Sequence, residues 1–167
     1  MTSAPKRLFV ISTKIWNAAR FVLTNKTTQI DTDKKTHRLT QIKPATSVDK
    51  KILKKLSETI KSVNQDLEKF HFGAAAHKLY NFFWRDFCDV YIEAAKSQKD
   101  KKSTEKILFY VLINSLKLLH PFIPFVTEKI YQNLPIKGKK ECLMIEEWPS
   151  VLINQGKNKK QNIKNKN

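Results

Sequence analysis

Side chains capable of acid–base, nucleophilic or metal chemistry are present, but their spacing does not assemble a reaction centre. The sequence has four histidines: His37, His71, His77 and His120. None of them has a partner residue at a spacing suited to metal ligation. Asp86 and Asp89 lie beside Arg85, so ion pairing accounts for these carboxylates. Three widely spaced glycines cannot build a phosphate-binding loop, and Cys88 and Cys142 match no metal spacing. We therefore predict no catalytic residue and no metal site.

Binding of a polyanion is the chemistry that the charge distribution favours. The formal net charge is +17, and residues 1–48 carry nine basic and two acidic side chains. Residues 137–167 carry eight basic and three acidic groups, whereas the middle of the chain is closer to balance. A nucleic acid is the corresponding partner. The alternative is a compositional bias toward Lys, Asn and Ile.

Residues 6–25 show helical spacing of apolar side chains. A predicted core stripe consists of Leu8, Ile11, Ile15, Ala18 and Val22. Trp16 and Arg20 are four residues apart, as are Asn17 and Phe21, so each pair shares one flank of the helix. Trp16 and Phe21 are either further core residues or exposed aromatic groups available for binding.

Residues 70–96 form the longest predicted helix. Its polar side chains follow one narrow stripe at steps of three and four residues: Lys78, Asn81, Arg85, Asp89, Glu93 and Lys96. A helix apolar over most of its circumference must be surrounded by other elements. We therefore expect the central helix of the domain here, with four aromatic side chains mostly buried: Phe83, Trp84, Phe87 and Tyr91.

Helix start and stop signals divide the remaining chain. Residues 26–44 are polar and read as a long loop that is either mobile or in contact with a ligand. Thr46 to Asp49 resembles a capping box that opens a helix with an apolar stripe: Leu53, Leu56, Ile60, Val63, Leu67 and Phe70. Ser103 or Thr104 is predicted to cap the next helix, and Pro124 to lie in the first turn of the last.

The predicted fold is all-α, a bundle of about five helices. Only three glycines and six prolines leave little material for the turns of an all-β fold. A short strand or extended segment is expected at Cys142 to Ile145. The predicted domain covers residues 1–150, and residues 151–167 form a basic, disordered tail. The sequence has no run of 18 apolar residues and no signal-peptide core, which favours the cytoplasm and no membrane partner.

Several motifs in this order resemble the anticodon-binding domain of valyl-tRNA synthetase, a class I aminoacyl-tRNA synthetase. They are WNAARFVLTN, EKFHFGAAAHKLYNFFWRDFCDVYIEAAK, LLHPFIPFVTEKIYQNLP and the closing Glu146-Glu147-Trp148-Pro149. HPFIPFVTE is shared among the valine, isoleucine, leucine and methionine enzymes. The aromatic pattern of residues 83–91 and the Trp16–Phe21 motif indicate the valine branch.

The resemblance implies a helical bundle that grips the anticodon stem-loop of valine tRNA. It assigns the anticodon contacts to Trp16, Asn17, Arg20 and Phe21. Unstacked anticodon bases can stack on aromatic or guanidinium planes, and Asn and Arg can bind base edges. Basic side chains of the first 48 residues would contact the phosphates, and we select Lys14, Lys34, Lys35 and Arg38.

The sequence also departs from the family. It lacks the catalytic motifs His-Ile-Gly-His and Lys-Met-Ser-Lys-Ser, and Lys51 stands where the family commonly has Trp in Asp-Arg-Trp-Ile-Leu. The full family uses ATP, but we expect no cofactor and no ligase activity in this chain alone. It would be a fragment or split product of a ligase, with a separate catalytic chain as a possible partner. The alternatives are a free-standing RNA-binding or regulatory protein derived from that module, and a helical interaction protein.

Overall fold

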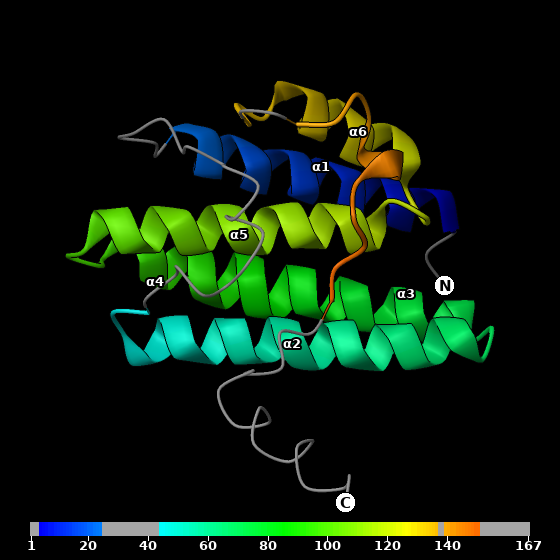
Figure 1. Ribbon diagram of the computed structural model, residues 1–167, viewed down its shortest axis with the longest axis horizontal. Coiled ribbons are helices and arrows are strands. Elements are labelled where there is room, and N and C mark those ends of the chain that lie inside the picture. Colours follow the sequence, from blue (N-terminus) through cyan, green and yellow to red (C-terminus); the bar gives the residue numbers. More distant parts are fainter. Residues whose placement is uncertain (1–3, 25–43, 137–138, 151–167) are drawn as a thin grey trace, which may run out of the picture.

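The computed structural model describes residues 4–24, 44–136 and 139–150, with side chains from Ser12 onward. Helices run nearly side by side through these residues, and no β-strand occurs among them (Figure 1). The longer elements are α1 (Ala4–Thr24), α2 (Ser47–Glu68), α3 (Phe72–Asn81), η2 (Phe82–Ile92), α5 (Lys101–Leu119) and α6 (Pro124–Asn133). Two short ones are α4 (Glu93–Lys96) and η3 (Leu143–Ile145). The predicted all-α helical bundle is confirmed.

Helix α5 occupies the centre of the bundle. Every side chain from Ile107 to Ile113 is buried, and α5 contacts α1, α2, α3, η2 and α6. Its buried Ser115 hydroxyl donates to the Val111 carbonyl, and Thr104 donates to the Asp100 carbonyl, so both are satisfied within the helix and its cap. The prediction that residues 70–96 form the central helix is therefore wrong.

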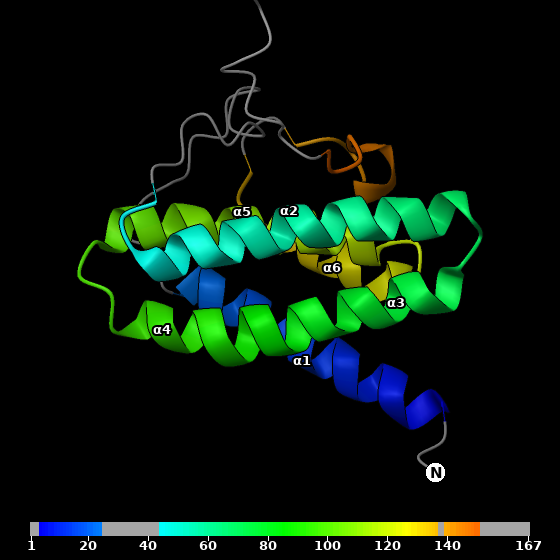
Figure 2. The ribbon, with the colours of Figure 1, turned by 90° about the horizontal axis from the view of Figure 1, so that it is seen from below.

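Helices α3, η2 and α4 form one continuous helical segment at the side of the bundle, which runs along α2 and contacts α1 through η2 (Figures 1 and 2). Phe83, Phe87 and Tyr91 are buried as predicted, but Trp84 is only half-buried. Tyr80 and Val90 on the same segment are exposed. The middle of the segment, η2, is a π-helix of 11 residues. Its wider turn changes which side chains face the core, and the 3.6-residue period assumed from the sequence does not anticipate that.

Helix α2 begins with the predicted capping box. The Asp49 amide donates to Thr46 Oγ1 (3.2 Å), and the Thr46 amide donates to Asp49 Oδ2 (3.0 Å). Its buried stripe consists of Asp49, Ile52, Leu56, Ile60 and Val63. The predicted stripe is therefore right in its centre and wrong at its ends.

The errors at the ends of that stripe involve three side chains. Leu53 and Leu67 are only half-buried, and Phe70 is exposed. Phe70 lies beyond the last turn of α2, so helical periodicity no longer applies to it.

The later elements confirm one predicted helix start and correct another. Pro124 opens α6 as predicted, where its missing amide costs nothing. The cap of α5 is Asp100, whose side chain accepts from the Ser103 amide (3.2 Å), rather than Ser103 or Thr104. Of the predicted strand or extended segment at Cys142 to Ile145, Cys142 is extended, whereas Leu143–Ile145 forms a 3₁₀ turn followed by the extended Glu146.

The remaining predictions about the fold concern residues that the structure does not describe. The loop at 26–43, the Leu8 and Ile11 side chains and the tail at 151–167 all lie outside the described part of the chain. Within the described ranges, no helix is long and apolar enough to cross a lipid bilayer.

Candidate nucleic-acid interface

Helix α1 presents three of the four predicted anticodon-contacting side chains to solvent. Trp16 is 38% exposed, and Asn17 and Arg20 are also exposed, whereas Phe21 is half-buried. The opposite side of the helix is buried and consists of Ile15, Ala18, Ala19 and Val22. We call Trp16, Asn17 and Arg20 the α1 face. An exposed tryptophan beside an exposed arginine is a pairing that can stack on and hydrogen-bond to an unpaired base.

The small residues of α1 explain its position. Ala18 and Ala19 are 5% and 3% exposed, and the absence of bulk lets α1 pack against α5 and α6. Because Ile15 and Val22 are buried on that side, the α1 face must point away from the core. The Thr24 hydroxyl donates to the Arg20 and Phe21 carbonyls (3.0 and 3.1 Å) in the last turn of α1.

Lys14 is held by the protein itself. Its Nζ lies 2.6 Å from Asp89 Oδ1 and 3.7 Å from the centroid of the Trp84 ring. Tyr80 stacks on Trp84 with the ring centroids 5.3 Å apart. To contact a phosphate as predicted, Lys14 would have to break its ion pair with Asp89 or bind the phosphate and Asp89 at the same time. Lys34, Lys35 and Arg38 lie outside the described residues.

Tyr80 and Trp84 were not predicted as site residues, although they lie beside α1. Their i,i+4 spacing was visible in the sequence, but the helical period assigned Trp84 to the core. The structure instead leaves Trp84 half-buried on η2, where Lys14 of α1 lies over its ring, and Tyr80 from the end of α3 stacks on Trp84. Phe21 of α1 lies near α4, with Lys96 Nζ 5.7 Å from its ring centroid.

A buried polar network fixes η2 to the start of α2. The Tyr91 hydroxyl donates to Asp49 Oδ1 (2.8 Å), and the Gln98 amide donates to the same oxygen (3.1 Å). Burial acts to raise the pKa of Asp49, but hydrogen bonds from Tyr91, Gln98 and Thr46 outweigh it and leave this pKa lowered. Sequence analysis found Asp49 only as a capping residue, because its partner Tyr91 is 42 positions away.

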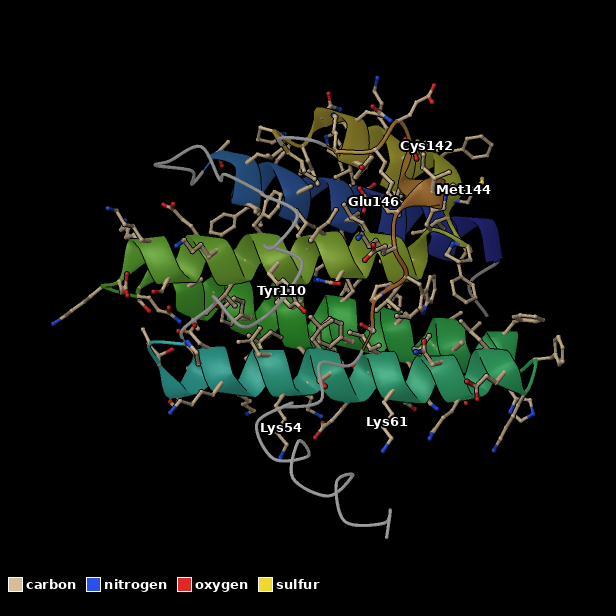
Figure 3. The ribbon with its side chains drawn as sticks, in the orientation of Figure 1. Lys54, Lys61, Tyr110, Cys142, Met144 and Glu146 are labelled. Atoms are coloured by element: carbon tan, nitrogen blue, oxygen red, sulfur yellow. The ribbon has the colours of Figure 1, made fainter. Side chains whose placement is uncertain are left out.

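A second network anchors the segment after α6. Glu146 accepts from the Tyr131 hydroxyl (2.6 Å) and from Lys117 Nζ (3.1 Å), and both members of this ion pair are buried. Burial acts to raise the pKa of Glu146, but the bonds from Tyr131 and Lys117 leave it lowered. Figure 3 shows Glu146 between the final segment and the helices it crosses.

The described residues bring no catalytic constellation together. No three His, Cys, Asp or Glu side chains among them could hold a metal ion. Burial raises the pKa of the Cys88 thiol to about 12, so this thiol is not a reactive nucleophile. Trp16, Asn17 and Arg20 on the α1 face offer groups for stacking and hydrogen bonding.

Comparison with known proteins identifies the class. Residues 49–166 match the family described as the anticodon-binding domain of tRNA ligase, which is more than half of the chain. The chain therefore belongs to this family. The match begins within α2, so α1 and its exposed face lie before it.

The individual relatives to which the chain is similar are valine–tRNA ligases. The protein from Bacillus anthracis is 47% identical over 144 residues, which cover 83% of this chain and 16% of that protein. Those from Pseudothermotoga lettingae and Bacillus subtilis are 45% and 44% identical, covering 85% and 83% of this chain and 16% of each relative. The resemblance to valyl-tRNA synthetase seen in the motifs is confirmed.

The extent of these alignments matters for the site. The alignment covers 83% of this chain, but residues 49–167 make up a smaller share of it than that. The similarity must therefore also include residues before Asp49. At the same time, the chain spans only about one sixth of the length of these relatives.

Proposed function

We propose that this chain is the tRNA-binding module of a valine–tRNA ligase and that it binds the anticodon stem-loop of valine tRNA. The observation that carries the proposal is the solvent exposure of Trp16, Asn17 and Arg20 on a domain of the anticodon-binding family. A helix that merely packed in the bundle would be expected to bury a tryptophan next to its core stripe.

The residues suit the task in distinct ways. The Trp16 ring offers a plane on which an unstacked base can lie, worth roughly 1–3 kcal/mol per base. The Arg20 guanidinium can bind a base edge with two hydrogen bonds, and Asn17 can both donate and accept. Phe21 is half-buried and would support the face from its edge. Lys34, Lys35 and Arg38 remain proposed phosphate contacts.

Arg20 provides the test, and Arg85 is its matched control. Arg20→Ala should narrow the preference for valine tRNA over other tRNAs by roughly 1–3 kcal/mol, if Arg20 makes a bidentate base contact. Arg85 is also exposed, so Arg85→Ala removes the same charge from a different helix and should leave this preference unchanged. The measurement is competitive filter binding among tRNA species, with helical content and melting checked for each variant. If Arg20→Ala folds normally and discriminates as well as the parent, the proposed role of α1 is wrong.

The ligase chemistry is proposed to belong to another part of the enzyme or to a separate catalytic chain. We infer this because the relatives are about six times as long as the region shared with this chain. The isolated chain should therefore catalyse no valine-dependent exchange of pyrophosphate into ATP. Exchange above that of a mock-purified control would contradict this prediction.

A free-standing RNA-binding or regulatory protein derived from the module is the second candidate. The observation in its favour is the formal net charge of +17, which favours binding to RNA in general. Binding of several tRNAs or other RNAs with equal affinity would favour this candidate. A catalytic fragment encoded next to this chain would favour the ligase module.

A further inference from the structure

Exposed apolar side chains gather at one end of the bundle. Among the described residues, nine large apolar side chains are exposed, and six of them come from elements that meet at this end: Phe70, Phe72, Phe125, Met144, Ile145 and Trp148. The turn between α2 and α3, the start of α6 and η3 lie together there, at the end where α1 begins (Figures 1 and 2). We call these six residues the end patch.

An apolar groove lies at this end of the bundle, and two members of the end patch, Phe72 and Trp148, line it together with Leu67, Pro121 and Phe122. The groove has a volume of about 510 Å³. Trp148 is fixed at its rim by a hydrogen bond from its indole Nε1 to Asn64 Oδ1 (2.9 Å). Phe70 and Phe72 meet edge to face beside it, with their ring centroids 6.1 Å apart. Figure 3 shows Met144 at the same end, directed outward from η3.

The backbone under the end patch is strained. Phe70 has φ of +59°, a left-handed conformation that is unfavourable for a bulky residue, and its side chain is 77% exposed. A phenylalanine that gains little burial and occupies a position suited to glycine does not contribute to the stability of this chain by itself. Strain of this kind commonly accompanies a binding role.

The chemistry of the end patch selects a protein partner rather than RNA. The described groove lining is aliphatic and aromatic, whereas RNA recognition needs cationic and hydrogen-bonding groups of the kind found on the α1 face. Clustered exposed apolar groups mark protein interaction sites. The relatives are about six times as long as the region shared with this chain, so the corresponding domain there belongs to a much larger protein. A segment joined ahead of α1 would also approach the bundle at this end.

We propose that the end patch docks the remainder of a valine–tRNA ligase, with Phe70 and Phe72 as its anchors. This inference rests on the proposed function for the identity of the partner. Docking at the end patch would fix the orientation of the α1 face relative to the rest of the enzyme. RNA binding and docking would then use separate surfaces of the bundle.

The test places this chain in the Bacillus subtilis valine–tRNA ligase, in exchange for the region to which it is 44% identical. Hydrogen exchange of the amides of residues 70–74, of the non-proline residues within 121–126 and of residues 143–148 should slow by about tenfold or more in this chimera, compared with the isolated chain. Amides 97–101, in the turn between α4 and α5, should exchange equally in both. Equal exchange of all four segments in chimera and isolated chain would overturn the proposal.

Two substitutions to Asp distinguish the loss of docking from the general effect of adding a charge at an exposed apolar side chain. Phe72 is 55% exposed and Val90 is 51% exposed, but Val90 lies on η2 near the opposite end. Phe72→Asp should lower aminoacylation by the chimera by about tenfold, because a charge would be buried without a partner, and Val90→Asp should change it less than about twofold. Full activity and full protection in the Phe72→Asp chimera would overturn the proposal. If Phe72→Asp fails to melt cooperatively, Met144→Asp, at a side chain 75% exposed, replaces it.

Two further measurements keep the two proposals distinguishable. The isolated Phe72→Asp chain should bind the anticodon stem-loop as well as the parent. Protection in the chimera without any tRNA binding by the isolated chain would contradict the proposed function and leave docking intact. Sedimentation of the isolated chain should show a monomer, and a dimer abolished by Phe72→Asp would assign the end patch to self-association and overturn docking.

Discussion

The buried carboxylate of Asp49 shows how a charged side chain is stabilised inside this bundle. Asp49 is 0% exposed, yet its carboxylate accepts bonds from Tyr91, Gln98 and two backbone amides. A buried carboxylate without such partners would be strongly destabilising. The network therefore joins three places distant in sequence: the start of α2, the end of η2 and the turn before α5.

The lowered pKa of Asp49 predicts how this network responds to acid. A carboxyl whose folded pKa lies below its unfolded value of about 3.9 contributes stability above that pH and loses it as the pH falls through the folded pKa. The melting temperature of the chain should therefore fall below about pH 4, with Glu146 contributing in the same direction. Asp49→Asn should cost roughly 1–3 kcal/mol at pH 7 and show a shallower decline in acid.

Tyr91→Phe is the matched control for that experiment. It removes one hydrogen bond but keeps the Asp49 charge, so it should cost about 1–2 kcal/mol at pH 7 and retain most of the acid dependence. Thermal melts followed by circular dichroism between pH 7 and pH 2 measure both quantities. An acid decline in Asp49→Asn as steep as in the parent would show that this carboxylate does not govern the response.

At the scale of elements, the turn between α2 and α3 departs furthest from local preference. The Phe70 amide donates to the Leu67 carbonyl (3.0 Å) and the His71 amide to the Asp66 carbonyl (2.8 Å), which is the Schellman pattern. Glycine is the usual residue at the left-handed position of that motif, and here the position is Phe70. Gly73 lies three residues later, inside α3, where nothing would contact an added Cβ within 4 Å.

Phe70→Gly should therefore stabilise the isolated chain. The left-handed conformation costs a non-glycine residue about 1–2 kcal/mol, partly offset by the greater freedom of glycine in the unfolded chain. We expect a gain of about 0.5–1 kcal/mol in the free energy of unfolding, measured by urea denaturation. Phe70→Ala removes the same ring but keeps the strain, so it should be less stable than Phe70→Gly by about 1 kcal/mol. Equal stability of the two variants would mean that the turn relaxes without strain.

The elements also show what the sequence could predict. Helix starts defined by local chemistry, at Thr46 and Pro124, were predicted correctly because capping depends on residues three or four positions apart. The centre of the bundle was not, because both α5 and residues 70–96 are strongly apolar and only packing decides which is surrounded. The π-helical segment added to this error, because Val90, which the helical period assigns to an apolar flank, is exposed there.

The candidate site was predicted only where it depends on residues close together in the sequence. The spacing of α1 placed Trp16 beside Arg20, and the motif resemblance assigned Trp16 an anticodon contact while the core alternative stayed open; the structure leaves Trp16 38% exposed. The contact of Lys14 with Asp89 and Trp84 could not be predicted, because it joins helices about 70 positions apart in the chain. Long-range pairs of this kind leave no periodic pattern in the sequence.

At the scale of the whole molecule, the surfaces of the bundle differ in character. The α1 face is polar and aromatic, the end patch is apolar, and the outer side of α2 carries exposed lysines. Helices α1 and α2 lie at opposite corners of the bundle, with α5 and the α3–η2–α4 segment between them (Figures 1 and 2). The α1 face and the outer side of α2 therefore lie on different sides of the bundle.

This arrangement distinguishes a specific interface from a general attraction of RNA to a chain of charge +17. Lys54 and Lys61 point outward from α2, away from α1 (Figure 3). Replacing both by Gln should change affinity for the valine anticodon stem-loop by less than about twofold and leave its salt dependence unaltered. Each lost contact with a single-strand phosphate would otherwise lower the logarithmic salt slope by about 0.7. Filter binding at several salt concentrations measures both, and a fall of about 1.4 in the slope for the double variant would show that the RNA follows the overall charge of the molecule rather than the α1 face.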